Sequence, residues 1–384
     1  MSQSKNWSPE LDGLRGYASL WVVLGHLCNL TECNIPILSS PSIGVDIFIL
    51  LSGYLMAKNY TERQHVEPWN SVKTMTSFWM RRFFRIAPLF YVLLIIALLL
   101  GEQFGNYREA IGNVWASTQT DPEKYADTSI VNFFAHISFA FGFGFLPYYS
   151  ARTTIPDWSI GLEMQYYALF PFIMLIIMRF GYIKTSLFIM ASCFVASQLA
   201  PGYFNEFTRP SMIAFKLPLF IAGMLIYKAA SDSKIYYSLI ALIAPISALG
   251  IGFLITPTRM VIEIIIVAGM AILLYPHKNK SPFKLIADTT KAFLSIKLSR
   301  FLGEVSYSVY LLHLMIVLPT IGILIEYPTF INLNPILRFI IATAISVPIT
   351  YVISTWLYKN VEVKGIAIGR KIIKPTSSKV KEVA

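Results

Sequence analysis

Four ionisable side chains interrupt long apolar stretches of the sequence. Arg15 and His26 lie in the first stretch, Asp46 in the second and Glu163 in a later one. Charge inside a membrane helix is costly, so residues of this kind usually have a function and face a protein or water-filled interior. A histidine exchanges protons near neutral pH, and a neighbouring carboxylate can hold its ring in one tautomer. These residue types predict acid–base chemistry inside a helix bundle.

Their spacing predicts where they meet. His26 follows Arg15 by eleven residues, which returns it to nearly the same helix face about 16 Å further along. We expect both to face one cleft. Asp46 lies just inside the outer end of its helix, at a depth similar to that of His26, where it can orient the imidazole. Glu163 reaches about the same level, so His26, Asp46 and Glu163 are predicted to share an outward-facing site.

A second group of polar residues lies near the C-terminal end. Ser306, Tyr310 and His313 follow an i, i+4, i+7 spacing, which places them on one side of a helix, directed at a protein or water-filled interior. They could line the same cavity. For these three residues and Asp46, hydrogen bonding that only holds helices together is the alternative role.

The elements that must position these residues are membrane helices. The chain has 384 residues, of which 55% are apolar and 14% charged, whereas a soluble domain carries about 25% charged residues. Its apolar runs are hydrophobic on all sides, which excludes a barrel with a polar interior. Hydropathy predicts an all-α membrane protein with about ten transmembrane helices, at residues 13–30, 43–59, 86–101, 158–178, 183–200, 211–228, 236–255, 259–275, 301–325 and 336–358.

The basic residues orient these helices. With both termini in the cytoplasm, 25 of the 32 Lys and Arg residues fall on the cytoplasmic side, as the positive-inside rule requires. An additional span at 130–147 would move 17 of those charges outside. We therefore predict that 130–147 is a re-entrant or interfacial segment within an outer loop, 102–157.

Several other classes of function are disfavoured. The net charge of +11 lies on the inner loops, where topology requires it, so no nucleic-acid partner is expected. The sequence lacks a GxSxG elbow, an HExxH site and a glycine-rich phosphate loop, and implies no metal and no permanently bound cofactor. Aromatic and arginine residues alternate over 71–85, which favours a segment lying on the cytoplasmic membrane surface, in contact with lipid. Pairing of Cys28 with Cys33 is left open.

The chain resembles membrane acyltransferase family three, a family of polysaccharide O-acyltransferases. The resemblance rests on five ordered motifs: Leu11-Asp-Gly-Leu-Arg-Gly16 with His26 beyond it, Gly44-Val-Asp-Ile-Phe-Ile-Leu-Leu-Ser-Gly-Tyr-Leu55, Arg82-Phe-Phe-Arg-Ile-Ala-Pro88, Trp158-Ser-Ile-Gly-Leu-Glu163 with Gln165-Tyr166-Tyr167, and Gly303-Glu-Val-Ser-Tyr-Ser-Val-Tyr-Leu-Leu-His313. The pair Ile160-Gly161 and Ala87 depart from the usual pattern without removing a proposed catalytic side chain.

This resemblance implies an acyl donor, an acceptor and a set of site residues. Acyl-CoA, most simply acetyl-CoA, is the expected cytoplasmic donor, bound by Arg82 and Arg85. The expected acceptor is a hydroxyl of a lipid-linked or surface polysaccharide, with O-antigen first and peptidoglycan or other envelope glycans behind it. His26 is the expected general base, together with Arg15, Glu163 and Asp46 as catalytic residues. The expected cavity-lining or acceptor-orienting residues are Ser52, Trp158, Ser159, Tyr167, Ser306, Tyr310 and His313.

The same resemblance suggests the organisation of the chain. We expect one transmembrane domain over 1–360 and a basic cytoplasmic tail over 361–384, in a stand-alone form without a fused hydrolase-like domain. The expected location is a bacterial plasma membrane. The competing class is a transporter or proton-coupled channel, in which Arg15, His26, Asp46 and Glu163 would form an ion path. The Arg82 and Arg85 pair, and the lack of a detectable inverted repeat, count against transport.

Overall fold

The regular elements are helices. The computed structural model describes residues 8–121, 124–125, 127–143, 152–207, 209–247, 257–279 and 281–373, and no strand occurs within these ranges, which confirms the all-α class. The α-helices are α1 Pro9–Leu30, α2 Ser42–Glu62, α3 Val72–Leu99, α4 Gly101–Val114, α5 Ile130–Ile137, α6 Trp158–Phe180, α7 Tyr182–Leu199, α8 Pro201–Asn205, α9 Leu217–Asp232, α10 Tyr236–Ala241, α11 Ala244–Ser247, α12 Pro257–Leu274, α13 Pro282–Leu294, α14 Lys297–Glu304, α15 Ser306–Leu324, α16 Pro328–Ile331, α17 Pro335–Leu357 and α18 Val363–Ile372.

Six helical segments among the described residues are long and apolar enough to cross a membrane. They are Val72–Leu99, Trp158–Phe180, Tyr182–Leu199, Pro257–Leu274, Ser306–Leu324 and Pro335–Ile372. Helices α1 and α2 have 22 and 21 residues, about 30 Å at 1.5 Å per residue, but they also carry polar side chains. The structure shows a multi-pass membrane protein, while ten spans and cytoplasmic termini stay predictions.

Two predicted outer or spanning segments are described only in part. Within 130–147, α5 forms a single short helix capped by the Ser129 hydroxyl, which accepts from the Asn132 amide at 3.1 Å. Residues 144–147 lie outside the described chain. Over 236–255, the described residues form the short helices α10 and α11, and residues 248–255 are likewise not described. The re-entrant placement of the outer segment remains a prediction.

The segment predicted to lie on the membrane surface, 71–85, is helical and continuous with the span that follows, and its place at a membrane surface stays a prediction. These residues form the first half of α3, which runs unbroken for 28 residues. Phe78 is buried, and the indole N–H of Trp79 donates to the Tyr167 carbonyl at 3.0 Å. Phe78 and Trp79 pack against α6, whereas Phe83 lies against Phe139, so the aromatic side chains of this half of α3 contact other parts of the protein.

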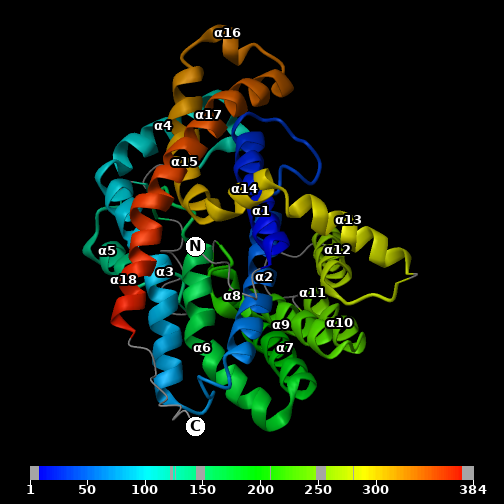
Figure 1. Cartoon of the computed structure of the whole chain (residues 1–384). Helices are drawn as coiled ribbons and strands as arrows, with labels where there is room; N and C mark the ends of the chain where they lie inside the picture. The colour runs from blue at the N-terminus through cyan, green and yellow to red at the C-terminus, as the bar shows by residue number, and fades with distance from the viewer. Residues whose placement is uncertain are drawn as a thin grey trace.

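The first part of the predicted tail 361–384 is helical. Helix α17 continues through a π-helical turn, Tyr358–Glu362, into α18, and the residues of α18 pack along α3 (Figure 1). Contact is close because Gly365 faces Pro88 and Gly369 faces Phe84, where an added Cβ would lie 2.5 Å from each side chain. Residues 361–373 are thus part of the folded domain, and 374–384 lie outside the described chain.

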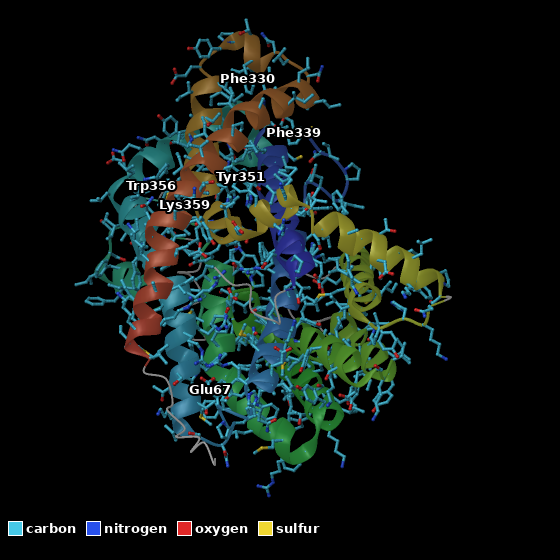
Figure 2. All side chains as sticks on the ribbon, in the orientation of Figure 1. Glu67, Phe330, Phe339, Tyr351, Trp356 and Lys359 are labelled. Carbon is cyan, nitrogen blue, oxygen red and sulfur yellow. The ribbon has the colours of Figure 1, made fainter. Side chains whose placement is uncertain are left out.

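One end of the molecule carries a charged loop. Phe330 and Glu67 mark opposite ends in Figure 2. Arg81 holds the Glu67 carboxylate with two bonds of 2.8 and 2.7 Å, and Arg63 adds bonds of 3.0 and 2.9 Å. Partial burial acts to raise the pKa of Glu67, but these guanidinium groups lower it to about 2, so the carboxylate stays charged and ties the loop after α2 to α3.

Glycine allows the central helices to cross closely. A Cβ on Gly53 of α2 would lie 2.0 Å from the Phe220 carbonyl oxygen of α9, and one on Gly223 would lie 2.1 Å from that of Leu50. Helix α1 meets α14 in the same way, where Gly16 lies against the backbone of Gly303. These crossings bring α1, α2 and α15 together around the interior of the bundle.

Candidate active site

Three cavities follow one another along α2. The inner cavity is lined by Leu55 and Asn59, the middle cavity by Val45, Ser52 and Leu55, and the outer cavity by Ser42 and Val45. Their volumes are about 480, 100 and 240 Å³, respectively. Neighbouring cavities share lining residues, so they form a series along 18 residues of helix, from Ser42 to Asn59, roughly 26 Å at a rise of 1.5 Å per residue.

Two other elements repeat this order. Along α1, Arg15 lines the inner and middle cavities and His26 lines the outer one. Along α14 and α15, Glu304 lines the inner cavity, Tyr307 the middle one, and Tyr310 both the middle and the outer. Arg15 and His26 therefore face the same series of cavities, as their spacing predicts, but at different positions in it.

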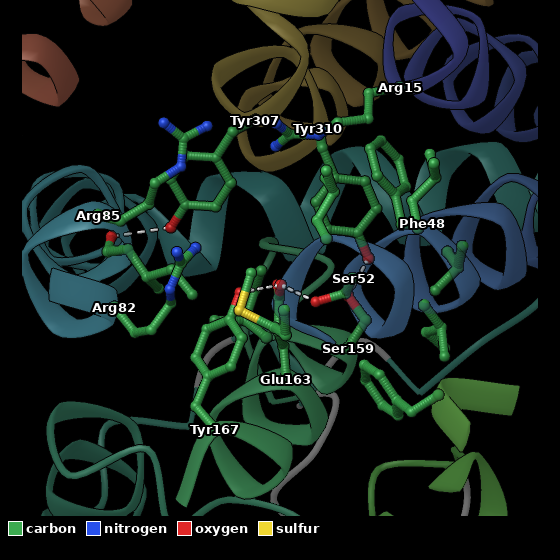
Figure 3. A pocket seen from close by; sticks show the side chains of 18 residues that line it. Arg15, Phe48, Ser52, Arg82, Arg85, Ser159, Glu163, Tyr167, Tyr307 and Tyr310 are labelled. Carbon is green, nitrogen blue, oxygen red and sulfur yellow. Dashed lines mark hydrogen bonds between the residues drawn. The ribbon is translucent and has the colours of Figure 1, made fainter. Parts of the chain in front are cut away.

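The middle cavity is rich in arginine. Figure 3 shows Arg82 and Arg85 from α3 beside Glu163 and Tyr167 from α6, with Arg15 entering from α1. Glu163 accepts hydrogen bonds from the Ser52 hydroxyl at 3.0 Å and from the Tyr167 hydroxyl. The guanidinium carbon of Arg82 lies 5.7 Å from the centre of the Tyr167 ring. These contacts orient planar cations toward a confined space, which suits an anionic ligand.

Glu362 is a site residue that the sequence analysis did not select. It lies in the π-helical turn after α17, 3.6 Å from the Arg85 guanidinium, and accepts a hydrogen bond from the Ser308 hydroxyl at 3.1 Å. Its side chain is buried. A single acid within an otherwise basic segment could have indicated its role. It was not selected because that segment was expected to be a tail outside the bundle.

His26 is paired with His313 rather than with a carboxylate. The Nδ1 atom of His313 lies 2.7 Å from the Tyr310 carbonyl oxygen, so this nitrogen carries the proton and Nε2 is an acceptor. The Nδ1 atom of His26 lies 2.9 Å from the Val22 carbonyl oxygen and 3.2 Å from Nε2 of His313, so it must also be a donor. With both rings neutral, Nε2 of His26 keeps a free lone pair and lines the outer cavity as a base.

Tyr310 stands where the middle and outer cavities meet. Its hydroxyl donates to the Pro156 carbonyl oxygen at 2.9 Å and lies 2.6 Å from the Ser159 hydroxyl. The side chain is thereby fixed by the start of α6, while its backbone carbonyl fixes His313. One residue of α15 thus links the wall between the two cavities to the orientation of the histidine pair.

The predicted role of Asp46 is corrected. Its carboxylate binds Lys216 at 2.9 Å and Arg259, and Glu263 binds the same two cations at 2.9 and 3.5 Å. A carboxylate so surrounded has no bond to His26. The ion cluster of Asp46, Lys216, Arg259 and Glu263 joins α2, α9 and α12. Lys216 and Glu263 lie inside predicted spans, so the rule that selected Asp46 would also have found them.

The predicted shared site of His26, Asp46 and Glu163 is therefore divided. His26 lines the outer cavity, Glu163 lines the middle one, and Asp46 lies behind the outer wall. Trp158 lines the outer cavity. Ser306 bonds only to the Gly303 carbonyl oxygen, at 2.8 Å, which matches the alternative that it stabilises the helices. Cys28 and Cys33 are buried free thiols.

The chain is thus of the class of helical membrane proteins with a polar interior. Arginines line its middle cavity, and a histidine lines the outer cavity of the same series. The family model described as an acyltransferase domain matches residues 8–355. The chain belongs to this acyltransferase family, as its five motifs suggest, and is an enzyme of the acyltransferase type.

Individual relatives are more distant. The peptidoglycan O-acetyltransferase OatA of Listeria monocytogenes is 28% identical over 181 residues, which is 46% of this chain and 25% of OatA. The putative membrane-bound transacylase BcsY of Komagataeibacter xylinus is 29% identical over 43% of this chain and 36% of its own length. A putative acetyltransferase of Acidianus two-tailed virus is 24% identical over 84% of this chain and 88% of its own. No solved structure matches.

Proposed function

We propose that this protein is a membrane O-acetyltransferase that moves an acetyl group from cytoplasmic acetyl-CoA to a hydroxyl of a cell-surface polysaccharide. The order of the three cavities along α1, α2 and α15 is the observation that supports this most. A donor that enters the inner cavity and an acceptor that enters the outer one would meet near Tyr310. The predicted topology places the inner cavity on the cytoplasmic side.

The donor would be held by the arginines. Coenzyme A carries phosphate groups, and guanidinium groups bind phosphate oxygens in pairs. Arg81, Arg82, Arg85 and Arg370 all line the inner cavity, and Arg82 and Arg85 continue into the middle one. The pantetheine arm would then lie in the middle cavity, whose walls include Phe48, with its thioester directed at Tyr310.

The acceptor would be activated by His26. Nε2 of His26 takes the hydroxyl proton as the oxygen attacks the thioester carbonyl, the new C–O ester bond forms, and the C–S bond breaks to release coenzyme A, which takes up a proton. General-base assistance of this kind is worth roughly 10²–10⁴ in rate. Arg15 and Glu163 would balance charge and orient the donor in the middle cavity. Direct transfer needs no acyl-enzyme intermediate.

The acceptor is proposed by class. A bacterial envelope polysaccharide fits an outer cavity at a membrane surface, and O-antigen or another lipopolysaccharide glycan is our first choice. Peptidoglycan is the second, because OatA is named for it. The residues of the outer loop that line this cavity include Thr120 and Tyr125, and they would contribute to the choice between sugars.

The test is O-acetylation of isolated surface polysaccharides from cells expressing the wild type or variants. Relative to the wild type, we expect His26→Ala to lose about 10²-fold or more of its activity, and the double variant Arg82→Ala with Arg85→Ala to lose acetylation through weaker donor binding. His65→Ala and Arg179→Ala are the controls, because both side chains are exposed and line none of the three cavities. Membrane abundance of each protein is measured by immunoblotting. Polysaccharides without protein-dependent acetyl groups in any fraction would contradict the proposal.

A further inference from the structure

Basic residues on the predicted outer side are few and unevenly placed. Seven of the 32 Lys and Arg residues fall there, namely Arg108, Lys124, Arg152, Arg209, Lys216, Arg259 and Arg338. Topology does not require them, because the positive-inside rule favours basic residues only in the cytoplasm. Four of the seven, Lys124, Arg209, Lys216 and Arg259, line the outer cavity beside His26.

The other three basic residues do not line the cavity and have other contacts. Arg152 lies 3.9 Å from Asp127. The guanidinium carbon of Arg338 lies 4.5 Å from the centre of the Trp115 ring, a cation–π contact. Arg108 lies against Tyr125 as its hydrogen-bond partner. The cations of the outer cavity are thus a distinct group rather than a general feature of the outer surface.

The acids that balance two of these cations stand behind the cavity wall. Asp46 and Glu263 are 1% and 2% exposed, bind Lys216 and Arg259, and do not line the cavity. Among the described lining residues the only carboxylate is Asp157. One of its oxygens is already bound by His136 at 2.9 Å and by the Thr153 hydroxyl at 2.6 Å.

The other two cations are more accessible. Arg209 is exposed and Lys124 is half-buried, with Asp121 nearby as a partly balancing charge for Lys124. Structural ion pairing explains Lys216 and Arg259, which their acids hold in place, but it does not explain why Lys124 and Arg209 face the same space. Two of the four cations are balanced by the acids behind the wall, so Lys124 and Arg209 give the lining its excess of positive charge, and a confined space focuses such a field.

We propose that the acceptor is an anionic glycan, with a carboxylate or phosphate group close to the hydroxyl that receives the acyl group. This inference rests on the proposed function, because it describes the ligand of the cavity that contains His26. Lys216 and Arg259 would bind the anionic group in the cavity, and Lys124 and Arg209 would attract and orient the chain at its entrance. A neutral glycan would offer no anionic group to Lys124 and Arg209.

The experiment measures equilibrium binding to the purified full-length protein in detergent. The probes are trigalacturonate and its trimethyl ester, which have the same sugars but differ in charge, and inorganic diphosphate. The variant is Lys124→Gln with Arg209→Gln, and Arg152→Gln is the control that removes an outer charge that does not line the cavity. We expect the ester to bind at least about tenfold more weakly than the acid, which is about 1.4 kcal/mol. Added salt should reduce this difference.

The results separate the two sources of negative charge. Tighter binding of diphosphate, with displacement of trigalacturonate, would identify a phosphate group such as that of a lipid carrier, and tighter trigalacturonate binding would identify a sugar carboxylate. In both cases the double variant should lose the charge preference and Arg152→Gln should keep it. Equal binding of acid and ester, or no binding of either charged probe, would overturn the inference. Acetyl transfer to surface polysaccharide is measured separately, so its failure would count against the proposed function instead.

Discussion

At the scale of single residues, the histidine pair is the most informative feature. Backbone carbonyl groups of Val22 and Tyr310 assign a proton to Nδ1 of each ring, so no carboxylate is needed to fix the tautomer of His26. In many enzymes an acid performs that task. Here the acceptor is Nε2 of His313, 3.2 Å away, which keeps the pair free of net charge in an apolar interior.

This arrangement predicts how His313 variants behave. Replacement of His313 by Phe should lower kcat by roughly tenfold to a hundredfold, a part of the general-base effect, because His26 loses an acceptor at Nδ1 and can rotate. KM for acetyl-CoA should change little, because the arginines proposed to bind its phosphates line the inner and middle cavities and do not contact His313. His313→Gln can restore an acceptor and should recover part of kcat. Steady-state kinetics with membranes test this, and a Phe variant with wild-type kcat would exclude a positioning role.

At the scale of elements, α18 extends the proposed donor site beyond the part of the chain that the family model matches, residues 8–355. It packs along α3, and its Arg370 lines the inner cavity together with Arg81, Arg82 and Arg85. A flexible tail would not hold a cation at that position. The π-helical turn that contains Glu362 sets the direction in which α18 leaves α17.

Arg370 provides a test of this extension. We expect Arg370→Gln to raise KM for acetyl-CoA about three- to tenfold with little change in kcat, the result expected when binding is lost equally from the ground and transition states. Lys371→Gln removes the same charge from the next residue, which is also exposed but does not line the cavity. Equal KM values for the two variants would show that α18 does not contact the donor.

The crossing of α2 and α9 makes a prediction about stability. A Cβ at Gly53 would lie 2.0 Å from a backbone oxygen of Phe220, and neither backbone can move away freely. Gly53→Ala should therefore destabilise the protein by about 1–3 kcal/mol. Gly269→Ala is the matched control in α12, where no atom lies within 4 Å. Thermal unfolding in detergent gives the midpoint temperature of each variant. Equal midpoints would mean that α2 and α9 can move apart at Gly53 without a loss of stability, which contradicts the prediction.

At the scale of the whole molecule, the sequence predicts the class of fold and most site residues but not their partners. Apolar runs and motifs identify the helical membrane class, Arg15, His26 and the arginines of α3. The ion cluster of Asp46 depends on which helices touch, and a single sequence does not contain that information. The continuous helix through Glu362 was missed because its charges outweigh its hydropathy, whereas packing against α3 decides its structure.

The wall at Tyr310 has a consequence for energy coupling. Under the proposed function, coenzyme A with its phosphates stays in the inner cavities and the glycan stays in the outer one. The acetyl group passes outward while the proton that His26 takes from the hydroxyl passes inward to the coenzyme A sulfur, so no net charge crosses. Membrane voltage does work only on charge, about 2.3 kcal/mol per elementary charge per 100 mV. The reaction would therefore run at the same rate in energised and de-energised membranes, driven only by thioester cleavage.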